Sequence, residues 1–167
     1  MSVPVVEGYT VRPLDDRDAI AVQRLFDEDP EYFADINGHS ITIEETRAAI
    51  PPGRTRADKF IFAVAKDDTV VGLIDIIRGY PKPATWFLGF LFLGRGVRGA
   101  GLGRRALHAI YAWAKGQGAE RLRLGVVEGN ERARRLYATE GFVQEGVREI
   151  DPSVNRYRRT LVLERPL

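Results

Sequence analysis

Three closely spaced apolar strands followed by one amphipathic helix restrict this chain to a mixed sheet. Phe60–Ala65, Val70–Ile77 and Thr85–Leu93 are separated by short turns, which predicts an antiparallel meander. An amphipathic helix at Arg104–Lys115 then leads to another apolar strand at Arg121–Val127. Such a strand–helix–strand unit places its two strands parallel, with a right-handed crossover. One crossover is too few for a doubly wound parallel sheet.

The flanking segments complete the order of elements. Before the meander, the pattern predicts a strand at Tyr9–Leu14, a helix capped by Asp15 or Asp16 and ended by Asp29-Pro30, a weaker helix that stops at Asn37-Gly38, and a helix at Ile43–Ile50. After the crossover, it predicts a helix at Glu131–Thr139 and strands at Val143–Glu149 and Tyr157–Glu164. We expect an α/β (α+β mixed) fold: a mostly antiparallel sheet of six to seven strands with helices on both faces, in a single domain of residues 1–167.

Composition excludes several classes of site. The chain has no cysteine, which excludes a disulfide scaffold, a Cys-ligated metal and thiol catalysis. Its longest apolar run, Trp86–Leu93, falls short of the roughly 20 residues that cross a bilayer. The polar start at Met1–Gly8 lacks the apolar segment of a signal peptide. We therefore expect a cytoplasmic protein without a metal and without a membrane partner.

Basic residues are concentrated in the second half of the chain. Residues 1–83 carry 10 basic and 15 acidic groups, whereas residues 84–167 carry 15 basic and 8 acidic groups. Of the 25 basic residues 21 are arginine, which suits bidentate binding of phosphate or carboxylate. The same charge would suit a nucleic acid, but the chain lacks a basic helix or an aromatic stacking motif, so we expect no nucleic-acid partner.

Glycines cluster between the third strand of the meander and the following helix. Four of them fall within residues 96–103. The absence of side chains lets the backbone turn its N–H groups toward a ligand, and a helix start adds unpaired N–H groups and a positive dipole end. Arg98 contributes a fixed charge in the same segment. The segment is therefore typical of a site for phosphate oxygens.

The glycines also match a dinucleotide fingerprint, Gly94-x-Gly96-x-x-Gly99. In dinucleotide-binding folds the helix begins within the fingerprint and an acidic residue ends the next strand. Here we expect the helix only after Gly103, and Glu120 precedes the next strand. These differences disfavour a nicotinamide or flavin protein.

Read as Arg-Gly-x-Gly-x-Gly, residues 98–103 resemble the pyrophosphate loop of the GCN5-related N-acetyltransferase (GNAT) family. A second family signature follows the next strand: Asn130-x-x-Ala133-x-x-Leu136-Tyr137-x-x-x-Gly141-Phe142. The resemblance covers about residues 60–145 well and the flanking elements only in order. It implies a GNAT-like sheet with a central strand–helix–strand cofactor unit, and an acetyl-CoA-dependent N-acetyltransferase without a metal.

The resemblance also implies which residues hold acetyl-CoA. The free end of the third meander strand would bind the pantetheine amides as an added strand does, and the glycine-rich loop would hold the pyrophosphate. The implied cofactor-binding residues are Leu91, Phe92, Leu93, Arg98, Gly99, Ala100, Gly101, Leu102, Gly103, Arg104, Asn130 and Ala133. Arg104, Arg105, Arg134 and Arg135 are candidates for the ribose phosphate or are solvated helix residues, and Asn130 is a candidate helix cap.

Acetyl transfer to an amine needs a base, an oxyanion donor and an acid for the departing thiolate. Tyr137 matches the family's general-acid position, and a backbone N–H near Leu93 would stabilise the oxyanion. Two carboxylates are candidates for the base: Glu128, after the strand Arg121–Val127, and Asp75, inside an apolar strand. Equally, Glu128 would pair with an arginine and Asp75 would face solvent.

The acceptor is expected to be a small-molecule amine or a peptide, which attacks directly in a ternary complex because no cysteine can carry the acetyl group. Residues 30–58 and 149–157 should shape its binding, and the acidic residues between Asp27 and Asp35 either attract a cationic amine or solvate their helices.

An alternative function is a catalytically weak acyl-CoA-binding sensor or partner module. The last strand, Tyr157–Glu164, could pair with a second copy in a homodimer.

Overall fold

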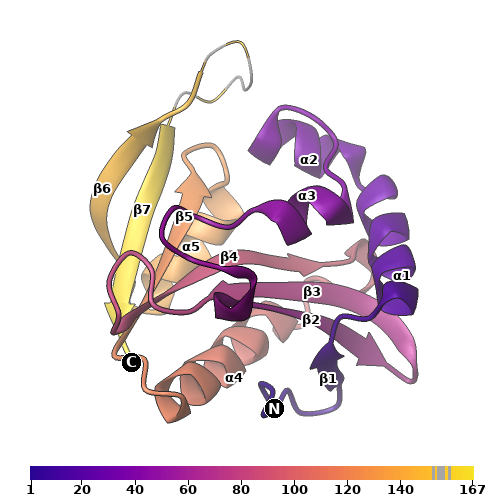
Figure 1. The fold of residues 1–167 in the computed structure, drawn as a ribbon. Helices are drawn as coiled ribbons and strands as arrows, with labels where there is room; N and C mark the ends of the chain where they lie inside the picture. The colour runs from indigo at the N-terminus through magenta and orange to yellow at the C-terminus, as the bar shows by residue number, and fades with distance from the viewer. Residues whose placement is uncertain (152, 154–156, 158) are drawn as a thin grey trace.

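The computed structural model describes residues 1–151, 153, 157 and 159–167. Within these residues the strands form one seven-stranded sheet in the order β1-β2-β3-β4-β5-β7-β6 (Figure 1). The strands are β1 (Thr10–Pro13), β2 (Lys59–Lys66), β3 (Thr69–Ile77), β4 (Thr85–Leu93), β5 (Arg121–Val127), β6 (Val143–Glu149) and β7 (Arg159–Pro166). Neighbouring strands pair antiparallel except β4 and β5, which run parallel. The expected mixed, mostly antiparallel sheet is confirmed.

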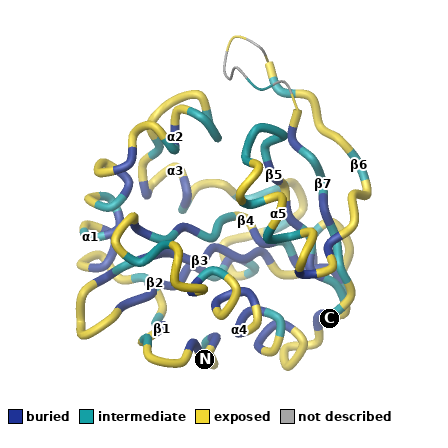
Figure 2. The backbone as a smooth tube through the Cα atoms, turned by 180° about the vertical axis from the view of Figure 1, so that it is seen from behind, coloured by how far each residue is buried: buried dark blue, intermediate teal, exposed yellow. Residues whose placement is uncertain are grey.

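Helices cover both faces of this sheet (Figures 1 and 2). They are α1 (Asp16–Asp27), α2 (Pro30–Asn37), α3 (Ile43–Ala48), α4 (Leu102–Gly116) and α5 (Glu131–Thr139), with short 3₁₀ turns at Arg56–Asp58 and Arg95–Val97. One apolar cluster joins α4 and α5 to one face of the sheet, and a second joins α1, α2 and α3 to the other face. None of the helices in the described part of the chain combines the length and apolarity needed to cross a bilayer.

Two helix starts differ from the sequence-based expectation. Helix α4 begins at Leu102 instead of Arg104, because Gly101 takes a left-handed conformation (φ 77°) and serves as its N-cap. The expectation that this helix begins only after Gly103 was therefore wrong. Pro30 opens helix α2 and does not merely end the helix before it. A proline suits the first helical position, where its missing N–H is not needed.

The last strand also differs, and with it the suggested dimer contact. Strand β7 spans Arg159–Pro166 rather than Tyr157–Glu164. It is hydrogen-bonded to β5 on one side and to β6 on the other, so it has no free edge for a second copy. The outer strands of the described sheet are β1 and β6.

Strands β4 and β5 are paired along only part of their length. Thr85–Leu88 pairs with Arg121–Leu124. From Gly89 onward β4 has only β3 as a partner in the described sheet, and from Gly125 onward β5 has only β7. The sheet is therefore divided between these two strands, on the side where the glycine-rich segment begins.

Candidate active site

The loop between β4 and α4 forms a cradle of main-chain N–H groups, here defined as residues 99–104. Gly99 and Gly101 have φ values of 86° and 77°, the left-handed region that favours glycine. A Cβ on either would meet no described atom within 4 Å, so the loop is open on this side. Within the described residues no main-chain carbonyl accepts a hydrogen bond from these N–H groups; the first such bond in α4 runs from Arg105 to Gly101 (3.1 Å). The cradle is therefore free to bind an anion at the positive end of α4.

The guanidinium of Arg98 is turned toward the protein. Its Nε donates to the carbonyl oxygen of Leu93 (2.6 Å), and its Nη1 lies 2.7 Å from Oδ2 of Asp29. The same group lies over the ring of Tyr32, 5.2 Å from the centroid. The sequence predicts that this positive charge binds phosphate, but the carboxylate of Asp29 already forms an ion pair with it. The main chain of the cradle is thus the more available set of donors for a phosphate.

Asp29 binds two arginines of the segment that follows β4. Its Oδ1 accepts from Nε (3.1 Å) and Nη2 (2.8 Å) of Arg95, while its Oδ2 faces Arg98. The residue is only 3% exposed. Burial by itself raises the pKa of Asp29, but the hydrogen bonds from the two guanidinium groups outweigh it and hold that pKa below its usual value. Because Asp29 directly precedes α2, this cluster of charges joins α2 to the cradle.

The free edge of β4 presents alternate residues to the opening between β4 and β5. Gly94 donates its N–H to a carbonyl of β3 (2.8 Å). Since main-chain groups alternate in direction along a strand, those of Leu91 and Leu93 point away from β3, toward the opening. By the same alternation the main-chain groups of Phe92 point to β3. Its side chain is buried in the apolar cluster under α1 and α2. Leu91 and Leu93 thus lie along the opening, whereas Phe92 belongs to the core.

Helix α5 brings the second signature to the opening. Asn130 caps this helix, since its Oδ1 accepts from the N–H of Ala133 (3.2 Å). The half-buried ring of Tyr137 packs edge-on against Phe142, with centroids 5.4 Å apart. Burial raises the pKa of Tyr137, and the phenol of Tyr32, from α2 on the other face of the sheet, raises it further. The Tyr137 hydroxyl therefore stays protonated at neutral pH and is a hydrogen-bond donor.

The two candidate bases have different surroundings. Asp75 is 4% exposed, and its Oδ2 lies 2.8 Å from Nζ of Lys59, which also donates to the carbonyl of Ala49 after α3 (2.9 Å). Asp75 therefore does not face solvent. Burial raises its pKa to about 6 although the Lys59 ammonium opposes the rise. Glu128 instead accepts a hydrogen bond from Arg159 of β7 (2.8 Å), the arginine pairing that the sequence analysis left open.

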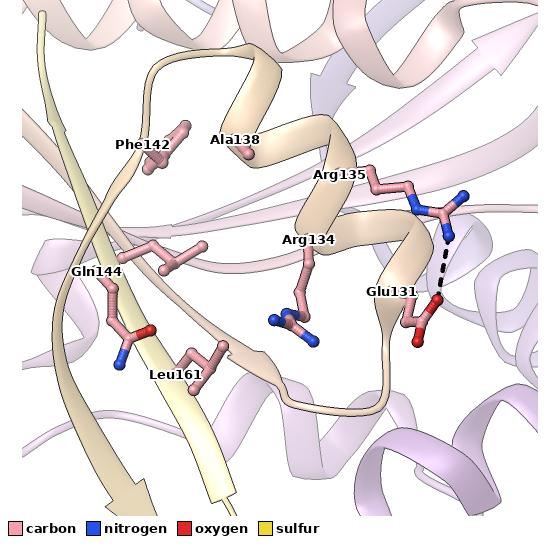
Figure 3. Close-up of a pocket in the computed structure, with 8 residues that line it drawn as sticks. Glu131, Arg134, Arg135, Ala138, Phe142, Gln144 and Leu161 are labelled. Atoms are coloured by element: carbon pink, nitrogen blue, oxygen red, sulfur yellow. Dashed lines mark hydrogen bonds and ion pairs between the residues drawn. The ribbon is translucent and has the colours of Figure 1, made fainter.

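The remaining candidate arginines lie in ion pairs or away from the opening. Arg104 pairs with the buried carboxylate of Glu140 (2.8 Å). Arg134 and Arg135 line a cavity of about 460 Å³ between α5 and the β6–β7 hairpin (Figure 3). Helical spacing puts Arg135 on the opposite side of α5 from Tyr137. Arg134 donates to the carbonyl oxygen of Glu128 (2.9 Å). None of the described residues that line the cavity belongs to the cradle, so the two sites are separate.

Two further expectations concern metals and the acceptor segments. Among the described residues, no group of three His, Cys, Asp or Glu side chains is arranged to hold a metal ion. The segment 149–157, expected to shape the acceptor site, lies partly outside the described residues. The sequence gives no signal for Lys59 or Gly89, and it marks Asp29 only as a helix end and as one of several acidic residues. The features that distinguish these three residues are contacts with other strands and helices.

Comparison with known proteins places these features in a family. Residues 20–142 match the model of the acetyltransferase (GNAT) family. Uncharacterized N-acetyltransferases of Mycobacterium bovis and Mycobacterium tuberculosis are 36% identical over 88 residues, which is 53% of this chain. The match covers 55% of those proteins, so the chain spans about half the length of the curated relatives it matches.

Solved structures resemble the whole fold. An acetyltransferase from Thermus thermophilus superposes with a TM-score of 0.72 at 26% identity, covering 97% of this chain and 99% of its own. A GCN5-related N-acetyltransferase from Kribbella flavida gives 0.71 at 25% identity, covering 96% and 99%. A putative acetyltransferase from Salmonella typhimurium, described with acetyl-CoA as its cofactor, gives 0.71 at 17% identity, covering 96% and 95%.

Proposed function

Because this chain belongs to the acetyltransferase (GNAT) family, we propose that it moves an acetyl group from acetyl-CoA to a primary amine, by direct attack in a ternary complex. The observation that carries the proposal is the cradle of unpaired N–H groups at the start of α4, beside the division between β4 and β5. The acetyl-CoA described for the Salmonella typhimurium neighbour supports the choice of acetyl donor.

The residues present fit this donor. The N–H groups of the cradle would bind the pyrophosphate, and no side chain closes the loop at Gly99 or Gly101. The main-chain groups of Leu91 and the N–H of Leu93 would bind the pantetheine amides as a neighbouring strand does, since the carbonyl oxygen of Leu93 already accepts from Arg98. In this arrangement the thioester lies toward Gly89, where β4 and β5 part. Its reactive carbon is then between the two faces of the sheet.

A bulge in β4 supplies the oxyanion donor in this proposal. Phe90 pairs with Asp75 and Leu88 with Ile76, so Gly89 is the extra residue between them. In the described sheet Gly89 has no strand partner on either side. A main-chain N–H at a residue outside the strand register can stabilise the developing oxyanion. The sequence predicts this donor near Leu93; because of the bulge we propose Gly89 instead.

Tyr137 is the proposed donor to the departing sulfur. Its raised pKa makes it a weak acid, and a thiolate with a pKa of about 8.5 is already a tolerable leaving group. We therefore expect Tyr137→Phe to lower kcat only about tenfold, less than the roughly 100-fold or more that is usual for acid catalysis, with little change in KM for acetyl-CoA. Tyr111→Phe is the control, because the Tyr111 phenol is also buried but lies under Arg165. Equal kcat values for the two variants would remove Tyr137 from the mechanism.

The proposed function is tested by combining a binding and a turnover measurement. Acetyl-CoA should raise the melting temperature, and spermidine, tyramine or an alanyl peptide should release the CoA thiol in its presence. Stabilisation by acetyl-CoA without turnover of any amine would favour the acyl-CoA sensor. Absence of both stabilisation and turnover would overturn the proposal.

A further inference from the structure

We propose that Asp75 takes the proton from the acceptor amine, that the amine reaches it over Gly89, and that Lys59 is the positioning residue that holds the Asp75 carboxylate. This assignment rests on the proposed acetyl transfer. It decides between two carboxylates that the sequence alone does not separate, and it adds two residues for which the sequence gives no signal.

A glycine on each strand marks the point where β4 and β5 part. Leu88 pairs with Leu124, and the next residues, Gly89 and Gly125, are both exposed. A Cβ on Gly89 would lie 2.9 Å from Oδ2 of Asp75. The buried Asp75 carboxylate therefore lies directly against Gly89, at the edge of the opening, and a side chain at this position would collide with it. This is the face of α1, α2 and α3, opposite the cradle of α4, so an acceptor would meet the thioester from the other side (Figure 1).

Distance along the strands favours Asp75 over Glu128. Asp75 pairs with Phe90, one residue from the proposed thioester position. Glu128 follows Gly125 by three residues, about 10 Å at the rise of a strand. Its carboxylate is also held by Arg159 on β7. Of the two carboxylates, only Asp75 borders the point at which the strands separate.

Lys59 sets the position and the charge of Asp75. The Lys59 ammonium is fully buried between Oδ2 of Asp75 and the carbonyl of Ala49, which fixes the carboxylate against β4. Oδ1 of Asp75 has no hydrogen-bond partner among the described residues. The charged groups that act on this carboxylate are Lys59 from β2 and Arg56 from the 3₁₀ turn, and both lower a pKa that burial raises to about 6. Asp75 is thus ionised at neutral pH and remains basic enough to act as a catalytic base.

In the proposed acetyl transfer the amine attacks the thioester carbon and the CoA thiol leaves. The acceptor ammonium transfers a proton to Asp75, and the nitrogen lone pair forms a bond to the thioester carbon. The carbonyl electrons move to oxygen, which the Gly89 N–H stabilises. They return as the carbon–sulfur bond breaks and Tyr137 gives its proton to the sulfur. The nitrogen, still positively charged after the attack, loses its second proton, which replaces the one that Tyr137 gave, so that a neutral amide and a thiol are left. Asp75 then releases the accepted proton to solvent.

The first test compares two buried aspartates. Asp75→Asn should lower kcat/KM for the fastest amine of the panel about 100-fold, within the range of lost base catalysis, while CoA affinity by calorimetry is retained. Asp18→Asn is the matched control, because Asp18 is also buried and ion-paired, with Arg12 (2.8 Å), but lies in α1. We expect it to lower the melting temperature and to leave kcat/KM close to that of the unmodified protein.

The second test uses pH and does not depend on the stability of Asp75→Asn. The kcat/KM of the unmodified protein should fall as the pH drops below about 6, where Asp75 becomes protonated. Lys59→Met should move this fall to higher pH, because the ammonium that lowers the pKa is gone. Gly89→Ala should reduce kcat/KM at least tenfold, whereas Gly116→Ala, where a Cβ meets no described atom within 4 Å, should not.

The outcomes separate this assignment from the function it rests on. If the protein is active and Asp75→Asn changes neither kcat/KM nor its fall at acid pH, the assignment is overturned and the proposed acetyltransferase function stands. If the fall at acid pH is lost in Glu128→Gln and retained in Asp75→Asn, the base is Glu128 and not Asp75. A protein without CoA binding or turnover would overturn the proposed function and this assignment together.

Discussion

Replacing Gly101 with valine is expected to weaken binding of CoA at least 100-fold while the sheet stays folded. Gly101 has a φ of 77°, which a β-branched residue adopts only with strain. A relaxed backbone would rotate the N–H groups of Leu102 and Gly103 away from their present direction. Hydrogen bonds to charged groups contribute roughly 1.5–3 kcal/mol each, so the loss of two accounts for the about 2.7 kcal/mol of a 100-fold effect. Titration calorimetry with CoA measures the change.

The control for this prediction lies at the other end of the same helix. Gly118 has a φ of 93°, and a Cβ there would also meet no described atom within 4 Å. Gly118→Val therefore introduces a similar strain after α4, far from the cradle. We expect it to lower the melting temperature about as much as Gly101→Val does and to bind CoA normally. If both variants bound CoA as the unmodified protein does, the main-chain cradle would not be the binding site.

The order of elements was predictable because its signals are local. The apolar run of β4, the alternation in β5 and the spacing of α5 give their bounds as the structure has them: Thr85–Leu93, Arg121–Val127 and Glu131–Thr139. The start of α4 was missed by two residues, since it depends on the conformation of Gly101 and not on apolar spacing. The bulge at Gly89 could not be read from the sequence either, because it is a shift in register against a neighbouring strand.

The charged contacts were less predictable than the elements. Arg98 occupies a position of the glycine-rich motif, which predicts a guanidinium available to phosphate, but Asp29, far away in sequence, lies against it. Asp29 carries no local pattern that distinguishes it from the acidic residues around it. The same holds for Lys59 and Asp75, which are 16 residues apart on neighbouring strands. Such pairs follow from the register of the sheet and from helix packing, which no local pattern encodes.

Replacing Asp29 with alanine is expected to lower the free energy of unfolding at pH 7 by about 3 kcal/mol. Removal of one partner from a buried ion pair costs roughly 3–5 kcal/mol, and the lower value applies because the side chain of Arg95 is 56% exposed. The variant leaves Arg98, 23% exposed, over the rings of Tyr32 and Phe92 without its carboxylate. Urea unfolding measures the difference. Glu31→Ala is the control: its carboxylate is 91% exposed and 3.9 Å from Arg95, so we expect a change below about 0.5 kcal/mol.

The stability lost in Asp29→Ala should depend on pH. Asp29 has a lower pKa in the folded chain than the usual value near 4, so its contribution is complete above that value and is lost as the pH falls through the folded pKa. The stability gap between the unmodified protein and Asp29→Ala should therefore be widest near neutrality and narrow in acid. In a double-mutant cycle with Arg98→Met, the two changes should cost less together than the sum of the single changes. A gap that does not vary with pH, together with additive effects, would show that Asp29 and Arg98 do not join α2 to the cradle.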